Sequence, residues 1–227
     1  MKTQELKAGR TNKGWTQVHA ASRLGITQAY LNFLEHGKRR LTPELVSRAT
    51  VVYGLSPDTL PLSSDFMPAP MDNQRLAELL AKVGYPGFAY FQTQVKRENP
   101  LEVLLQALSQ EKLEGRVAEA LPWVALHYAK ADSWLVDNAR KFNLQNRLGF
   151  VVSLAQRTAE KHNNSRLVDL NELEQKLNES RLVKEDVFYR PPRSESEKIW
   201  LKDNRTSDAV HWNLLTDMRA EQLQYVT

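Results

Sequence analysis

The sequence of 227 residues contains no cysteine, so disulfide bonds and thiolate metal sites are excluded. It also contains no run of 18 apolar residues, and its first ten residues lack the apolar core of a secretion signal. We therefore expect neither a membrane-spanning helix nor export, and the lack of cysteine fits a reducing compartment. Together these absences predict a cytoplasmic protein.

Catalytic and metal-binding patterns are equally scarce. The chain has five histidines, and none belongs to a His-Glu-x-x-His pair or lies at helical ligand spacing from another. No glycine-rich phosphate loop is present, and a self-cleaving Ser/Lys domain would need a β-rich C-terminal part that this sequence pattern argues against. We therefore predict no enzymatic activity, no catalytic residue, no metal site and no cofactor.

The excess of positive charge is concentrated in the first quarter of the chain. Residues 1–60 contain nine Lys and Arg against four Asp and Glu, a net charge of +5, whereas the remaining residues have a net charge of −1. A polyanionic partner for this quarter is the direct physical interpretation. A chance fluctuation of a few charges explains the same numbers, so charge alone leaves both interpretations open.

A proline-rich stretch divides the chain. Residues 60–72 read LPLSSDFMPAPMD and include Pro61, Pro68 and Pro70. Proline removes a backbone donor and disfavours helix in the residue before it, so this stretch is a linker or a strapped-down connection. We predict an N-terminal domain at 1–62, a linker at 63–72, and a larger domain at 73–227 for dimerisation, partner binding or effector binding.

Helical periodicity dominates both domains and predicts an all-α fold. In the first domain, helices are expected at 16–24, 27–36 and 42–53, with a last short helix opening at Ser56-Pro57. In the second domain, they are expected at 72–83, 100–110, 114–128, 132–142, 144–161, 167–177 and 194–203, with a final stretch around 212–218. Pro122 is expected to kink or restart its helix. Only 184–189 alternates as a strand does.

The most informative stretch runs from Trp15 to Arg39. Gly25 stands where the first of two helices must end, because glycine tolerates a left-handed backbone, and Thr27 can cap the next helix with its hydroxyl. Ala21 is small enough to let the two helices approach closely. The apolar residues spaced to form a shared core are Val18, Ile26, Leu31 and Leu34, with Trp15 and Leu24 beside them.

The other side of the second helix carries a different set of side chains. Gln28, Ala29 and Asn32 point away from the core, and Phe33 lies near the same surface. Glutamine and asparagine amides match the donor and acceptor on the major-groove edge of adenine, and an apolar side chain can meet a thymine methyl. We therefore predict Gln28, Ala29, Asn32 and Phe33 as base contacts in double-stranded DNA.

Residues at the ends of these two helices can hold the phosphate backbone. Gln17 begins the first helix, where backbone amides commonly bind phosphate, and three basic residues follow the second helix. The predicted backbone contacts are Thr16, Gln17, Thr27, Lys38, Arg39 and Arg40. The alternative is a helical hairpin that serves only for protein contact.

Residues 6–60 resemble the phage-repressor/Cro-like helix-turn-helix family, often called the Xre family in bacteria. The matching residues are Thr16-Gln17, Ala21, Leu24-Gly25-Ile26-Thr27-Gln28, Tyr30-Leu31, Leu34-Glu35, Gly37-Lys38-Arg39 and Leu55-Ser56-Pro57. The resemblance implies a five-helix domain that places its third helix in the major groove, and a homodimer bound to a palindromic operator. It also implies a transcriptional regulator, which we interpret as a repressor. Phe33 departs from the polar residue common at its position.

The C-terminal two-thirds give fewer signals. Four tryptophans (Trp123, Trp134, Trp200 and Trp212) are expected to anchor the core or a domain seam. The segment 145–147 (QNR) fits a capped helix start, a buried polar network or a partner contact. The tail 200–215 fits either a segment that orders on a partner or a packed helix.

This part is similar, through LPW at 121–123 and QNRLGF at 145–150, to the second domains of Xre-type antitoxins or defence-associated regulators. That similarity implies a cognate toxin as a partner and autoregulation of a shared operon. Two alternatives stay open. One is a one-component regulator that senses a small ligand, and the other is a protein-interaction module without DNA binding.

Overall fold

The computed structural model of the chain describes residues 1, 3–91 and 98–225. These residues form two compact units: residues 1–63 with 98–99, and residues 64–91 with 100–225. Nearly all of their regular structure is helical, and the two strands have two residues each. The prediction of an all-α fold with a larger C-terminal helical part is confirmed. None of the described helices is long and apolar enough to cross a bilayer.

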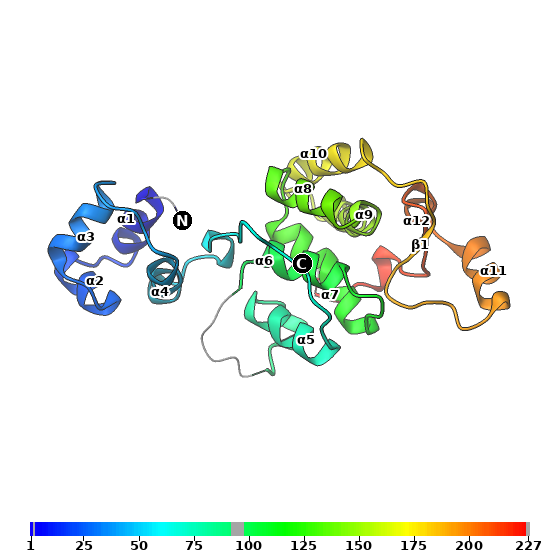
Figure 1. Cartoon of the computed structure of the whole chain (residues 1–227), viewed down its shortest axis with the longest axis horizontal. Helices are drawn as coiled ribbons and strands as arrows, with labels where there is room; N and C mark the ends of the chain where they lie inside the picture. Colours follow the sequence, from blue (N-terminus) through cyan, green and yellow to red (C-terminus); the bar gives the residue numbers. More distant parts are fainter. Residues whose placement is uncertain (2, 92–97, 226–227) are drawn as a thin grey trace. The chain divides into compact units, whose positions relative to one another are not determined.

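The first unit contains the helices α1 (Thr3–Asn12), α2 (Gln17–Leu24), α3 (Gln28–Glu35) and α4 (Pro43–Tyr53), drawn in blue shades in Figure 1. Both α1 and α2 contact α3 and α4. Thr42 caps α4 by accepting a hydrogen bond from the backbone N–H of Leu45 at 3.3 Å, as its place before Pro43 predicts. The last helix expected in this unit is a three-residue 3-10 turn, η1 (Pro57–Thr59).

The core of the first unit differs from the sequence prediction at one position of α2. Among the predicted core residues, Leu24, Leu31 and Leu34 are fully buried, and Trp15 and Ile26 are partly buried against them. Val18 is 64% exposed, so its predicted place in the core is wrong. The buried face of α2 instead follows Ala20, Ala21 and Leu24, because residues at i, i+1 and i+4 share one side of a helix.

The second unit is built around α9 (Gln145–Lys161), most of whose residues are buried. The other helices are α5 (Asn73–Lys82), η2 (Pro86–Phe88), α6 (Pro100–Leu108), α7 (Gly115–Tyr128), α8 (Ser133–Lys141), α10 (Leu167–Asn178), α11 (Glu195–Asn204), α12 (Ser207–His211) and η3 (Ala220–Gln222). Helix α9 packs against α6, α7, α8, α10 and α12. Strands β1 (Asp186–Val187) and β2 (Leu214–Leu215) pair in parallel, and β1 lies within the predicted strand at 184–189.

Two stretches of the second unit differ from the sequence prediction. Helix α7 continues through Pro122 without a restart and packs against α6 and α9, whereas the alternative of a kink stays a prediction. The stretch 212–218 is not helical: Asn213 has a left-handed φ of 51°, and β2 follows it. The side-chain amide of Asn213 stabilises this turn by donating to the carbonyl of Leu182 at 2.9 Å.

The polar residues that open α9 form a buried network, one of the three alternatives left open by the sequence. The amide of Asn146 donates to the carbonyl of Leu182 and accepts from its N–H, both at 2.9 Å. Arg147 donates to the carboxylate of Asp186 at 2.7 Å and to the carbonyl of Leu108 at 2.9 Å. Leu144 precedes the helix and gives it no side-chain cap, so the capped start is not what these residues provide.

The four tryptophans differ in how deeply they are buried, and the tail is packed. Trp123 and Trp212 are buried and Trp134 is half-buried, but Trp200 on α11 is 52% exposed, so it is not a core anchor. The tail 200–215 packs onto the second unit, because Trp212 and both residues of β2 are buried.

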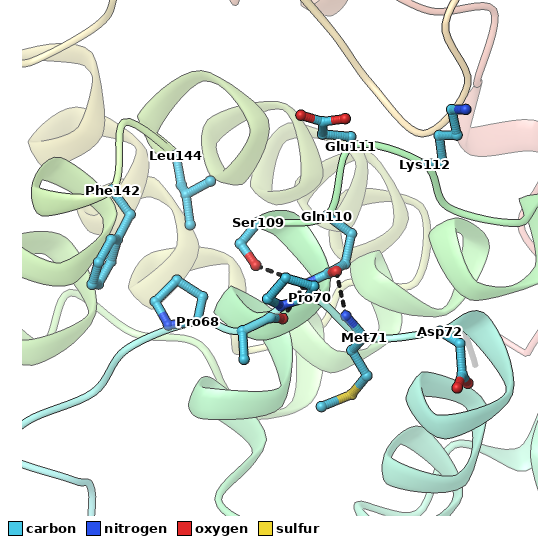
Figure 2. Close-up of a pocket in the computed structure, with 11 residues that line it drawn as sticks. Pro68, Pro70, Met71, Asp72, Ser109, Gln110, Glu111, Lys112, Phe142 and Leu144 are labelled. Atoms are coloured by element: carbon cyan, nitrogen blue, oxygen red, sulfur yellow. Dashed lines mark hydrogen bonds between the residues drawn. The ribbon is translucent and has the colours of Figure 1, made fainter.

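The proline-rich stretch before α5 is strapped onto the second unit. Phe66 is buried, with its ring centroid 5.4 Å from that of Trp134. Further along, the N–H of Met71 donates to the side-chain oxygen of Gln110 at 2.9 Å, and the amide of Gln110 donates back to the carbonyl of Ala69 at 3.0 Å (Figure 2). The side chain of Gln106 brackets Ala69 in the same way.

Candidate nucleic-acid interface

Capping residues set the limits of the two helices α2 and α3. The hydroxyl of Thr16 accepts from the N–H of His19 at 3.2 Å, and the hydroxyl of Thr27 accepts from the N–H of Tyr30 at 3.2 Å. Between the helices, Gly25 has a φ of 66°, a left-handed conformation that glycine adopts without steric cost. The guanidinium of Arg48 on α4 holds this turn by donating to the carbonyl of Leu24 at 2.6 Å. The turn that orients α3 is therefore held by three features: the Thr27 cap, the left-handed conformation of Gly25 and the hydrogen bond from Arg48.

A buried ion pair ties α3 to the rest of the first unit. The Nε and Nη2 atoms of Arg10 on α1 donate to the two carboxylate oxygens of Glu35 at 2.6 and 3.0 Å. The Glu35 side chain is fully buried, and that of Arg10 is 12% exposed. Arg10 also donates to the carbonyl of Trp15, and Gln17 donates its side-chain amide to Glu35 at 2.9 Å. One carboxylate thus joins α1, α2 and α3.

Electrostatics favour the charged form of this pair. Burial raises the pKa of Glu35, but hydrogen bonds from Arg10 and Gln17 and the charge of Arg10 outweigh it, so the pKa lies below its ordinary value. The hydrogen bond to Glu35 raises the pKa of Arg10 against the opposing effect of burial. Both groups are therefore ionised near neutral pH, and α3 is held by a charged contact.

Gln17 needs a correction, because its side-chain amide is bonded to Glu35 rather than free. A phosphate held at the start of α2 would have to use backbone N–H groups there. The sequence contained Arg10, Gln17 and Glu35, but their spacing of 7 and 18 residues matches no single helix face. The signal that would have revealed the cluster was the presence of a glutamate among the core positions of α3.

Tyr53 closes the same cluster from α4. Burial, and next the charge of Glu35, raise the pKa of Tyr53 to about 12. Its hydroxyl has no hydrogen-bond partner among the described residues. The ring lies against Gly9 of α1, where an added Cβ would stand 2.9 Å from the Cδ2 atom of Tyr53. Gly9 therefore lets α1 approach α4 closely enough to bring Arg10 to Glu35.

The predicted base-contact residues share an exposed side of α3. Gln28, Ala29 and Asn32 are exposed, and Phe33 is 45% exposed, whereas Leu31 and Leu34 on the opposite side are fully buried. The backbone carbonyl of Asn32 is bonded to the ring Nδ1 of His36 at 2.8 Å, which leaves the Asn32 side-chain amide outside this contact. Two amides and two apolar side chains are thus presented together on one helix face.

The basic run after α3 is also exposed. Gly37 has a φ of 70° and ends the helix, and the N–H of Lys38 bonds the carbonyl of Phe33 at 2.8 Å. Lys38, Arg39 and Arg40 are exposed, and within residues 1, 3–91 and 98–225 they make no ion pair. Their charge is available to a polyanion. Thr16 and Thr27 are exposed at the starts of α2 and α3, although their hydroxyls already serve as caps.

Comparison with known proteins identifies this unit. Residues 6–60 match the protein-family model described as Helix-turn-helix. Searches of curated proteins and of solved structures gave no match for the chain. The matched range begins within α1 and ends just after η1, so it covers the caps, the turn, the buried ion pair and the exposed face of α3.

Proposed function

We propose that the protein is a sequence-specific DNA-binding repressor, because residues 6–60 match the Helix-turn-helix family model and resemble the Xre type of transcription regulator. The observation that carries the proposal is the exposed face of α3, where Gln28, Ala29, Asn32 and Phe33 stand opposite a fully buried leucine face. A helix fixed on one side and polar on the other can enter a major groove without unfolding any of the core.

The proposed contacts divide into two kinds. Gln28 and Asn32 would hydrogen-bond adenine edges, and Ala29 and Phe33 would contact thymine methyl groups. The phosphate backbone would be held by the residues at the helix ends, namely Thr16, the backbone N–H groups at Gln17, Thr27, Lys38, Arg39 and Arg40. The base contacts would determine which DNA sequence is preferred, whereas the cations would supply affinity for any duplex.

We propose that two copies bind together on a palindromic operator in the cytoplasm. A single helix in the groove reads only a few base pairs, and members of this structural class double that number by binding as dimers. Two heads on one face of B-DNA would read half-sites about 10 base pairs apart, or a multiple of that spacing. We assign no catalytic activity to the chain.

Paired substitutions test this division. The operator is first selected from random duplexes with the full chain. Gln28→Ala should then relax the base preference at one position by roughly 1–3 kcal/mol, whereas Arg39→Ala should weaken all duplexes alike and flatten the salt dependence. Gln74→Ala and Lys161→Ala are matched controls on exposed positions of the second unit. Equal, salt-insensitive losses for Gln28→Ala and Arg39→Ala, or no retention of any duplex at low salt, would exclude groove binding and favour the protein-interaction module.

A role as an antitoxin is the second candidate, and exposed apolar residues on α11 favour it. Ile199 and Trp200 are 53% and 52% exposed on adjacent positions of this helix, and exposed tryptophan is typical of the central residues of protein interfaces. The test is co-purification with the product of the adjacent reading frame. Trp200→Ala should abolish the complex and leave DNA binding intact. A complex that survives both Trp200→Ala and Ile199→Ala would remove this support.

A further inference from the structure

The second unit contains a cavity of about 320 Å³ between η2, α7 and the end of the described chain. Tyr85 and Phe88 line it from η2 and the residue before it, Arg116 and Glu119 line it from the first turns of α7, and Tyr225 lines it from the tail. Three aromatic rings and two opposite charges therefore meet at one small space. Its volume lies at the lower end of the range of small-molecule sites.

Tyr85 is a buried residue that lines this cavity. The residue is only 4% exposed, and among the described residues its hydroxyl makes no hydrogen bond. Gly87 makes room for the ring, because a Cβ added there would stand 2.5 Å from the Cε1 atom of Tyr85. Burial, and next the nearby charge of Glu119, raise the pKa of Tyr85 to about 12. The hydroxyl is therefore a protonated, unused donor.

The two charges at the cavity are also unused. Arg116 and Glu119 stand three residues apart on α7, a spacing that puts their side chains on neighbouring turns of one face. In the part of the chain that the structure describes, neither of them forms an ion pair or a side-chain hydrogen bond. A guanidinium, a carboxylate and a phenol thus line one cavity without partners among the described residues, and the guanidinium of Arg116 is exposed.

This combination selects a ligand that carries an ammonium and a carboxylate on the same carbon atom. Arginine pairs with a carboxylate in a bidentate geometry, and the Tyr85 hydroxyl can add a hydrogen bond to the same group. Glutamate attracts an ammonium, and the aromatic rings of Tyr85 and Tyr225 also line the cavity. We propose that this cavity binds a free α-amino acid, with its carboxylate on Arg116 and Tyr85 and its ammonium on Glu119.

The larger groove of the same unit is a weaker candidate. It has a volume of about 910 Å³ and lies beside Pro68, Pro70 and Phe142 (Figure 2). Among the polar side chains that line it, Gln110 is already bonded to the N–H of Met71 and Ser109 to the carbonyl of Gln106 at 2.7 Å, and Glu111 and Lys112 are exposed. A ligand there would have to displace bonds within the protein, whereas the smaller cavity offers three free groups.

Calorimetric titration of the full chain with each of the twenty common L-amino acids tests the proposal. At least one should bind and raise the melting temperature. Arg116→Gln and Glu119→Gln should each weaken its binding by about tenfold or more, the effect of losing one charge-assisted hydrogen bond. Tyr85→Phe should weaken it by about three- to tenfold. Glu111→Gln and Lys112→Gln, which line the larger groove, are the matched controls and should change nothing.

Analogues of the bound amino acid separate its two ends. Its methyl ester lacks the carboxylate and its N-acetyl derivative lacks the ammonium, so both should bind at least tenfold more weakly to the wild-type protein. Absence of binding for all twenty at about 10 mM would overturn the proposal. Binding that is unchanged in both charge variants would overturn it as well. No DNA enters these measurements, so their failure is distinct from failure of the repressor assignment.

Discussion

The two units bury polar groups in different ways. In the first unit, the fully buried carboxylate of Glu35 is matched by the guanidinium of Arg10. In the second unit, the described polar residues that are buried are neutral, and the ion pair of Arg147 and Asp186 is more exposed. The indole N–H of Trp212 there donates to the hydroxyl of Ser153 at 2.9 Å. That hydroxyl in turn contacts the carbonyl of Gly149 and a carboxylate oxygen of Glu174, both at 3.0 Å.

The difference lies in what each arrangement depends on. A buried ion pair is held by charge, so it fails when either partner is removed or neutralised. A neutral contact around an indole is held by shape, so it fails when extra atoms are introduced. The face of α3 that we propose to bind DNA depends on the first kind of contact, and the core of the larger unit depends on the second. Four measurements would break or sharpen this comparison.

The largest effect is expected for Glu35→Gln. The substitution leaves the charge of Arg10 buried without its partner, and such losses cost about 3–5 kcal/mol. Peptide-resolved hydrogen exchange of the full chain in urea should show α2 and α3 opening far below the midpoint of α9. Asp58→Asn removes an exposed carboxylate of the same unit and should have almost no effect. Parallel destabilisation of α9 would contradict the separation of the two units.

The second unit should respond instead to volume. A Cβ added at Gly149 would lie 2.4 Å from the Cζ2 atom of Trp212. Gly149→Ala should therefore cost about 1–3 kcal/mol, although alanine normally stabilises a helix by about 0.5–1 kcal/mol relative to glycine. Gly115→Ala is the matched control on α7, because its Cβ would meet nothing within 4 Å. A stabilised Gly149→Ala variant, measured by urea unfolding, would show that the indole moves aside freely.

Acid should act on the first unit before the second. The pKa of Glu35 in the folded state lies below its ordinary value of 4.5. Its contribution to stability is therefore complete above that ordinary value and is lost as pH falls through the lower, folded pKa. The effect should be smaller than that of Glu35→Gln at neutral pH, because it sets in only as the carboxyl takes up a proton. Protection of α2 and α3 against exchange, corrected for the intrinsic pH dependence of amide exchange, should fall between pH 7 and pH 3 in the wild type, and the Glu35→Gln variant should lack this slope.

The smallest effects are expected for two tyrosines and should have opposite signs. Tyr53→Phe removes a buried hydroxyl that has no hydrogen-bond partner among the described residues, so the first unit should gain up to about 1 kcal/mol. Tyr128→Phe removes a hydroxyl that donates to the carbonyl of Val83 at 2.8 Å, so the second unit should lose about 1 kcal/mol. Urea midpoints of both variants provide the check. A loss in Tyr53→Phe would mean that its hydroxyl is bonded in solution.

Short-range features of the fold could be predicted from the sequence. Thr27 and Thr42 cap helices where they were expected, and Gly25 adopts the left-handed conformation that its position required. These predictions succeed because a cap or a turn depends on neighbours within four residues. The same local logic predicted which side of α3 is exposed, because buried Leu31 and Leu34 define the opposite face.

Features that depend on distant partners could not be predicted in this way. Gln17 was assigned to phosphate because the sequence gives no sign of its actual partner, Glu35, which stands 18 residues away. Asn146 and Arg147 find their partners more than 35 residues away, at Leu182 and Asp186. Val18 was placed in the core from its apolar character and its spacing to Ala21, although α2 buries Ala20, Ala21 and Leu24 instead. A spacing rule within one helix contains no information on any of these contacts.

The stretch before α5, residues 64–72, decides where the chain can be divided. Phe66 belongs to the aromatic cluster of the larger unit, and residues 69–71 are held by the side-chain amides of α6 and the residues after it. A fragment that starts at the beginning of α5 would lack residues 64–72 and uncover the rings of Trp134 and Phe142. Expression of the larger unit alone should therefore begin at residue 64, and a fragment starting at residue 73 should aggregate.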